Sequence, residues 1–165
     1  MDELEVSIAE LAARLASNLQ QQGMTLAVAE SCTGGWLAKV LTDLSGSSAW
    51  FLGGVVSYSN AAKHNVLAVE NTCLDEFGAV SEPVARQMVS GVSKAFSSSL
   101  AVSITGVAGP SGGTLEKPVG MVCFAVKNNV GDVYASTKQF AGDRQQVRLQ
   151  AVYAALQLLL GAMAD

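Results

Sequence analysis

Short apolar runs alternate with helical patterns along this chain, and this alternation restricts the fold more than any other feature of the sequence. Five runs have the length and the β-branched or aromatic content of strands. Turn residues at 128–131 separate the last two runs and indicate a β-hairpin. The expected strands cover residues 24–29, 50–58, 100–105, 119–127 and 133–140.

Helices are expected before, between and after these strands. Apolar residues recur every three or four positions over residues 3–22, and Gly23 follows as a stop signal. Ser31 or Thr33 can cap the next helix, Ser59 and Asn60 cap the short helix after it, and Ser81 begins a later one. The expected helices are 3–22, 34–44, 61–67, a stretch from Ser81 to the serines at 97–99, and 143–162, with an irregular segment or helical turn over 71–78.

This order of elements predicts an α/β protein, a three-layer α/β/α domain with a mixed, mainly parallel five-stranded sheet. The 165 residues fit one domain, and half of them are apolar, which is ample for a single core. We therefore expect one domain over residues 1–165, with its ligand site outside the carboxyl ends of the strands.

Composition excludes several classes of partner and site. The net charge is −4 and no cluster of lysines or arginines occurs, which argues against binding to nucleic acid or to an anionic membrane. Cys32, Cys73 and Cys123 form no CxxC pattern, so we expect no metal site and a reducing, cytoplasmic location. The most apolar stretch, 151–163, is too short to span a bilayer.

Three clusters of polar residues and glycines directly follow expected strands. In the first, at 29–35, a strand gives way to a sharp turn and a helix start, where backbone N–H groups can hold an anion. Ser31 is either a nucleophile beside oxyanion donors or an ordinary helix cap, and this motif alone favours the cap. Cys32 is either a rival nucleophile or a small core residue.

The second cluster, at 58–63, contains a candidate base for Ser31. A lysine in the first turn of a helix faces the positive end of the helix, and partial burial lowers its pKa further. A neutral Lys63 can then accept the serine proton, with Tyr58 orienting it or relaying a proton. Taken alone, a solvated lysine and a tyrosine at the edge of the core is the stronger interpretation. His64, the single histidine, is expected at the surface or behind the site.

The third cluster is a glycine-rich loop over 104–113, whose N–H groups can form an anion-binding concavity. It matches neither GxGxxG nor a P-loop, and a mobile connection is the alternative. Lys117, just after it, can meet a phosphate. Arg144 begins the last helix, an unfavourable place for a cation unless an anion binds there, and Arg148 follows one turn later. Two surface arginines are the other interpretation.

Together these motifs resemble the CinA C-terminal domain family, whose characterised activity is nicotinamide-nucleotide amidase. The likeness covers nearly the whole chain, and the combination is specific although each motif alone is weak. The motifs are AESCTGG at 29–35, YSNAAK at 58–63, GAVSEPV at 78–84, TGVAGPSGG at 105–113, KPVG at 117–120 and FAGDR at 140–144.

The resemblance implies hydrolysis of nicotinamide mononucleotide to nicotinate mononucleotide and ammonia, a step of pyridine nucleotide (NAD) recycling. It implies a serine amidohydrolase mechanism without metal or cofactor, in which Ser31 is the nucleophile and Tyr58 and Lys63 activate it. Arg144 is implied as a contact of the substrate phosphate. The substrate-binding residues carried over by these motifs are Thr33, Gly34, Asn60, Thr105, Gly106, Ala108, Gly109 and Arg144.

Two other functions stay open from the sequence. One is a non-catalytic module that binds a nucleotide or phosphate with its glycine loops, and the other is an amidase with a different small substrate. A homodimer is a further option, because the apolar C-terminal helix, Trp36 or Trp50 can form a subunit interface, although burial in the core explains them equally well.

Overall fold

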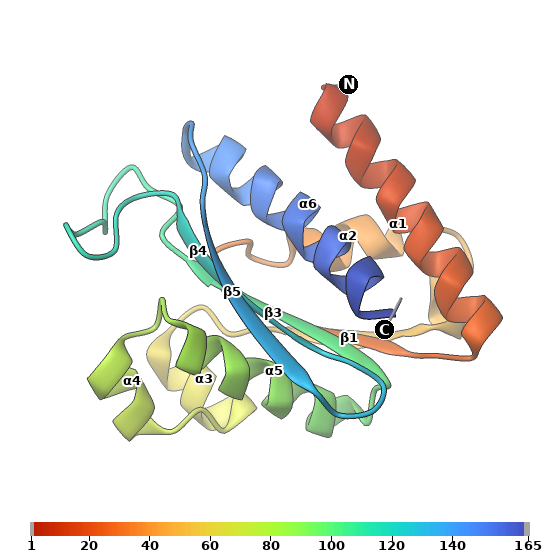
Figure 1. Ribbon diagram of the computed structural model, residues 1–165, viewed down its shortest axis with the longest axis horizontal. Helices are drawn as coiled ribbons and strands as arrows, with labels where there is room; N and C mark the ends of the chain where they lie inside the picture. The colour runs from red at the N-terminus through yellow and green to blue at the C-terminus, as the bar shows by residue number, and fades with distance from the viewer. Residues whose placement is uncertain (1, 164–165) are drawn as a thin grey trace.

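One mixed sheet of five strands runs through the molecule and is covered by helices on both faces (Figure 1). The computed structural model describes residues 2–163. The strand order is β2-β1-β3-β4-β5, in which β2, β1 and β3 are parallel and β4 and β5 pair antiparallel. This confirms the predicted three-layer α/β/α fold. The strands are β1 Leu26–Glu30, β2 Phe51–Val56, β3 Leu100–Gly106, β4 Met121–Lys127 and β5 Val133–Gln139.

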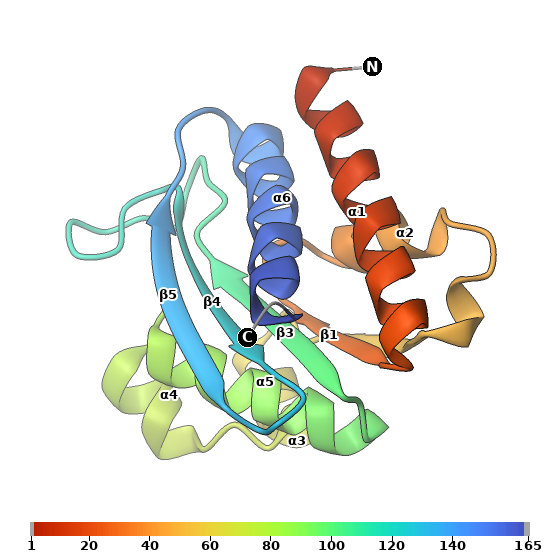
Figure 2. The ribbon, with the colours of Figure 1, turned by 45° about the vertical axis from the view of Figure 1, so that its right-hand side comes forward.

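The helices on the two faces of the sheet come from different parts of the chain (Figures 1 and 2). α1 Glu3–Gln22, α2 Trp36–Thr42 and α6 Arg144–Met163 cover one face, and α3 Asn60–Leu67, α4 Asn71–Phe77 and α5 Glu82–Phe96 cover the other. The segment over 71–78, expected as irregular or a helical turn, forms the seven-residue helix α4. Within residues 2–163, no helix is both long and apolar enough to cross a membrane.

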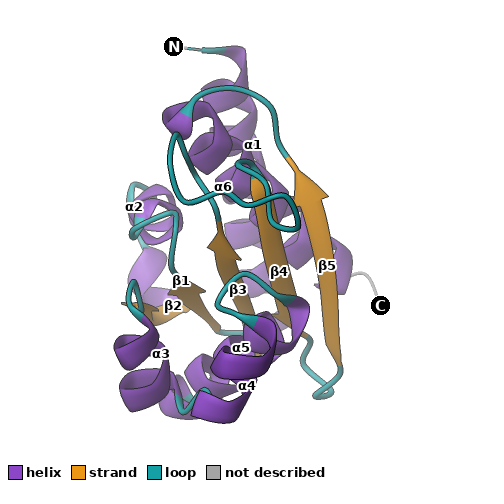
Figure 3. Cartoon of the chain, turned by 90° about the vertical axis from the view of Figure 1, so that its left-hand side faces the viewer, coloured by secondary structure: helices purple, strands orange, loops and turns teal. Residues whose placement is uncertain are grey.

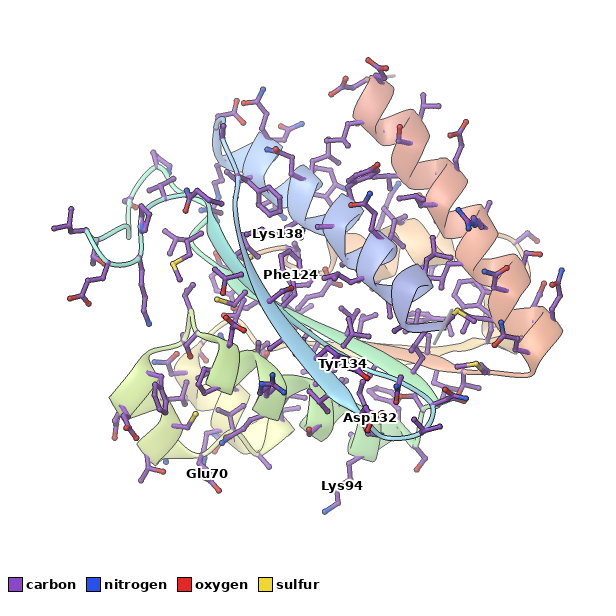
Figure 4. The ribbon with its side chains drawn as sticks, viewed as in Figure 1. Glu70, Lys94, Phe124, Asp132, Tyr134 and Lys138 are labelled. Atoms are coloured by element: carbon purple, nitrogen blue, oxygen red, sulfur yellow. The ribbon has the colours of Figure 1, made fainter. Side chains whose placement is uncertain are left out.

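Side chains of different size point to the two faces of the sheet. In β4, Val122, Phe124 and Val126 lie in the core on the side of α6, whereas Cys123 and Ala125 face the helices on the other side. Figure 4 shows Phe124 beside the sheet below α6. β3 repeats this alternation of large and small residues. The small side chains allow α5 to approach the sheet closely, because no bulky group separates them.

The start of α2 differs from the expected serine or threonine cap. Its N-cap residue is Gly35, which has no side chain to cap the helix. Instead, the buried carboxylate of Glu30 accepts hydrogen bonds from the backbone N–H groups of Leu37 at 2.9 Å and Ala38 at 3.0 Å. A carboxylate at this end of a helix interacts favourably with the helix dipole. The cap expected at Ser31 or Thr33 was therefore wrong, and the Ser31 hydroxyl is free for another partner.

α5 needs a glycine where it crosses α3. A side chain at Gly91 would overlap the carbonyl oxygen of Leu67, whereas a side chain at Gly161 in α6 meets no atom of residues 2–163 within 4 Å. We expect Gly91→Ala to lower the free energy of unfolding, measured by urea titration, by about 1–3 kcal/mol. Gly161→Ala is the matched control and should raise it by up to about 1 kcal/mol. Similar effects of the two changes would contradict this close approach.

Candidate active site

The carboxyl ends of three parallel strands meet at one edge of the sheet (Figure 3). Ser31 follows β1, which lies between β2 and β3. Its backbone N–H donates to the carbonyl of Ile104 in β3 at 2.9 Å, and the N–H of Ser57 after β2 donates to the carbonyl of Glu30 at 2.9 Å. The chain leads from β1 to β2 on one side and from β3 to β4 on the other, so Ser31 lies where the two connections diverge, the usual location of a ligand site in such sheets.

The amine of Lys63 is hydrogen-bonded to the hydroxyl of Ser31, with 2.8 Å between Nζ and Oγ. Lys63 lies in the first turn of α3, where the Ser59 side chain caps the helix as predicted. Nζ also donates to the carbonyls of Ser57 at 2.8 Å and Tyr58 at 3.3 Å. The Lys63 side chain is almost completely buried, at 1% exposure, and forms no salt bridge with any residue in 2–163.

Burial lowers the pKa of the Lys63 ammonium below its ordinary value of 10.5. The cause is the loss of hydration of the charged form, and only neutral oxygens surround Nζ to replace the water. An amine with a lowered pKa beside a serine hydroxyl is the arrangement of a base with its nucleophile. The geometry therefore supports proton transfer from Ser31 to Lys63.

The two other residues that sequence analysis considered for this chemistry lie in unsuitable environments. Burial raises the pKa of the Cys32 thiol to about 12, so the sulfur remains a protonated, poorly nucleophilic thiol near neutral pH. His64 Nδ1 is 2.8 Å from the carbonyl oxygen of Val69, which lies just after the end of α3. Neither residue competes with the pair of Ser31 and Lys63.

Tyr58 contacts Lys63 through the Tyr58 backbone carbonyl, and the Tyr58 side chain makes a different contact. The Tyr58 hydroxyl accepts a hydrogen bond from Arg144 Nη2 at 3.0 Å, while Arg144 Nη1 donates to the carbonyl of Gly109 at 2.8 Å. The sequence did not indicate this link. Arg144 at the start of α6 thus links Tyr58, two residues after the end of β2, to the glycine-rich loop after β3.

A cavity of about 280 Å³ opens beside Ser31 and Lys63. Thr33 is completely buried and Gly34 lies at the surface, and neither lines the cavity. A larger cavity of about 620 Å³ lies between α6 and the end of β5 and contains none of the predicted site residues. The predicted residues that line the smaller cavity are Ser31, Tyr58, Asn60, Lys63, Thr105, Gly106, Ala108, Gly109 and Arg144.

The sequence did not identify the residues that form one wall of this cavity. Ala79 and Val80, in the segment before α5, line it, and the buried hydroxyl of Thr105 donates to the carbonyl of Ala79 at 2.9 Å. Only the GAVSEPV motif drew attention to this segment. Lys117, considered above for a phosphate contact, donates to the carbonyl of Phe77 instead. In the part of the chain that the structure describes, no cluster of three or more His, Cys, Asp or Glu side chains is arranged to bind a metal.

Residues 8–163 match the sequence profile of the CinA C-terminal domain. The chain belongs to the CinA C-terminal domain family. Two curated relatives in the family are named nicotinamide-nucleotide amidohydrolase PncC. The one from Enterobacter agglomerans is 48% identical over 156 residues, 94% of this chain and 95% of the relative. The one from Escherichia coli K12 is 49% identical over 150 residues, 91% of each chain.

A solved member of the family has nearly the same fold. The crystal structure of competence/damage inducible protein CihA from Agrobacterium tumefaciens superimposes with a TM-score of 0.93 at 41% identity and covers 94% of this chain and 95% of that chain. The resemblance based on the sequence motifs and the predicted fold class are therefore both confirmed.

We expect the Lys63 amine to titrate below 10.5, because burial disfavours its charged form. NMR of protein labelled with ¹³C-lysine measures this directly, and the signal lost in Lys63→Met identifies the residue. Since the pKa is lower in the folded than in the unfolded chain, this residue's contribution to the free energy of unfolding decreases as pH falls from 10.5 to the folded pKa. A Lys63 signal that titrates at 10.5 or above would contradict the assignment of a base.

Proposed function

We propose that this protein hydrolyses the carboxamide of nicotinamide mononucleotide to nicotinate mononucleotide and ammonia, as a step in the recycling of NAD. The observation that carries this proposal is the 2.8 Å hydrogen bond between the buried Lys63 amine and the Ser31 hydroxyl at the cavity. The names of the relatives at 48% and 49% identity support a nicotinamide nucleotide as the substrate.

In the first half of the reaction, Ser31 Oγ attacks the carboxamide carbon while the neutral Lys63 amine accepts its proton. The resulting oxyanion is stabilised by backbone N–H groups of the turn after β1, and one such donor contributes on the order of 3 kcal/mol to the transition state. Lys63 then gives the proton to the departing nitrogen. Ammonia leaves, and the nicotinoyl group remains as an ester on Ser31.

In the second half, Lys63 accepts a proton from the water that attacks the ester, and gives that proton to Ser31 Oγ as the bond to Oγ breaks and the carboxylic acid leaves. Tyr58 assists by holding Nζ with its backbone carbonyl at 3.3 Å. Its hydroxyl remains on Arg144 beside the cavity. In this account the tyrosine positions the lysine and shapes the substrate site, and its phenol does not relay the proton.

Substitution of either reacting residue should abolish ammonia release. For Ser31→Ala and Lys63→Met we expect turnover of nicotinamide mononucleotide to fall by at least about 10²–10⁴-fold, because one removes the nucleophile and the other the base. A coupled ammonia assay measures this, and circular dichroism verifies that each variant is folded. Full activity in either variant would refute the mechanism. Substrate binding by the wild-type protein without ammonia release would instead indicate a binding module.

The substrate phosphate is proposed to bind at Arg144 and at the glycine-rich loop. Arg144 is exposed and lines the cavity, and the N–H groups of Ala108 and Gly109 have no hydrogen-bond partner within residues 2–163. A guanidinium group and free amides together suit a phosphate.

Arg144→Gln should therefore raise KM for nicotinamide mononucleotide by about 10–100-fold, because a hydrogen bond to a charged group is lost. kcat should change little, since Arg144 does not contact Ser31 or Lys63. Steady-state kinetics with nicotinamide riboside, which lacks the phosphate, provides the control. An equal loss with the riboside would show that Arg144 does not act through the phosphate.

A further inference from the structure

Arg148 binds the turn that carries Ser31, and the mechanism above gives it no role. Its Nε donates to the carbonyl of Cys32 at 3.0 Å and its Nη2 to the carbonyl of Thr33 at 3.0 Å. The guanidinium carbon lies 5.2 Å from the centroid of the Trp36 ring, within range of a cation–π contact. A planar group with two parallel donors matches two successive carbonyls, and a lysine ammonium does not reproduce this geometry.

The two hydrogen bonds fix the orientation of the peptide groups around Ser31. The N–H and C=O of a trans peptide point in opposite directions, so the carbonyl of Cys32 held by Arg148 directs the N–H of Thr33 to the other side. The carbonyl of Thr33 likewise directs the N–H of Gly34, which donates to the carbonyl of Ser31 at 3.0 Å. That last bond orients the peptide between Ser31 and Cys32, and with it the N–H of Cys32.

Most other N–H groups of this turn already have partners. Ser31 N–H donates to the carbonyl of Ile104 and Trp36 N–H to that of Thr33, and the carboxylate of Glu30 accepts from the next two N–H groups of α2. The N–H groups of Cys32 and Thr33 have no hydrogen-bond partner in another residue of the described chain, 2–163. Of these two residues only Cys32 lines the cavity, so its N–H remains as a donor directly after the nucleophile, the position from which a backbone amide stabilises an oxyanion in other serine hydrolases.

We propose that Arg148 is a positioning residue for the reaction, which fixes the turn and, through the Gly34 N–H bound to the Ser31 carbonyl, orients and polarises the Ser31–Cys32 peptide so that the N–H of Cys32 stabilises the oxyanion. This inference rests on the proposed function. A cation bound to a carbonyl oxygen withdraws electron density from the peptide and makes its N–H a stronger donor. Arg148 does not line the cavity, so it acts through the turn and not on the substrate.

Steady-state kinetics of Arg148→Gln and Arg148→Lys tests this role. We expect kcat for nicotinamide mononucleotide to fall on the order of 10–100-fold in Arg148→Gln and by a smaller factor in Arg148→Lys, which keeps the charge. KM and the pH dependence set by Lys63 should stay unchanged. Arg86→Gln is the matched control, because Arg86 also donates to a backbone carbonyl, that of Val133 at 2.9 Å, but lies outside the site.

A second measurement does not depend on activity. In ¹⁵N-labelled protein, Arg148→Gln should shift the amide signals of Cys32 and Thr33 and speed hydrogen exchange at Gly34, and Arg86→Gln should leave all three unchanged. Should Arg148→Gln prove too unstable to study, Arg148→Lys is measured in the same way.

Three results would overturn the inference: a wild-type kcat in Arg148→Gln, a rise in KM with kcat unchanged, or amide signals that do not change. Absence of ammonia release from the wild-type protein would refute the proposed function instead. The amide signals would then test only whether Arg148 fixes the turn after Ser31.

Discussion

The contact between the buried amine of Lys63, which has no counter-ion within residues 2–163, and the hydroxyl of Ser31 is the interaction on which the rest of the site depends. Lys63 Nζ has only hydroxyl and carbonyl oxygens as partners, so burial disfavours its charged form. The nearest carboxylate in sequence to Ser31, that of Glu30, is hydrogen-bonded to the start of α2. Because the Glu30 carboxylate is hydrogen-bonded to the start of α2, it forms no ion pair with Lys63 that would keep the amine protonated.

The last helix completes a site whose reacting groups come from the first half of the chain. Arg144 binds the carbonyl of Gly109 and the hydroxyl of Tyr58, and Arg148 binds the turn after Ser31. A cation in the first two turns of a helix is unfavourable with respect to the helix dipole. Carbonyl oxygens from other elements stabilise these two arginines, which links the placement of α6 to the shape of the cavity.

Local signals in the sequence predicted most elements correctly. The caps at Ser59 and Ser81 were confirmed, because a capping side chain binds an N–H only three residues away. The cap expected at Ser31 or Thr33 was wrong, because the carboxylate of Glu30 reaches over the turn to α2. Tyr58 was expected to orient Lys63 or relay a proton, and its carbonyl contacts Nζ. The hydrogen-bond partner of its phenol, Arg144, lies 86 residues further along the chain, and local spacing does not reveal it.

The sequence by itself determined the alternation of helices and strands, the glycine-bearing turns at strand ends and the residue types that chemistry at those ends requires. Only the tertiary structure decided that β2, β1 and β3 are neighbours, which brings Ser31 and Lys63, 32 residues apart, within 2.8 Å. It also decided that Arg148 binds a carbonyl 116 residues away. The reason is physical: caps and turns arise from contacts over a few residues, whereas strand order follows from how all the apolar faces are buried together.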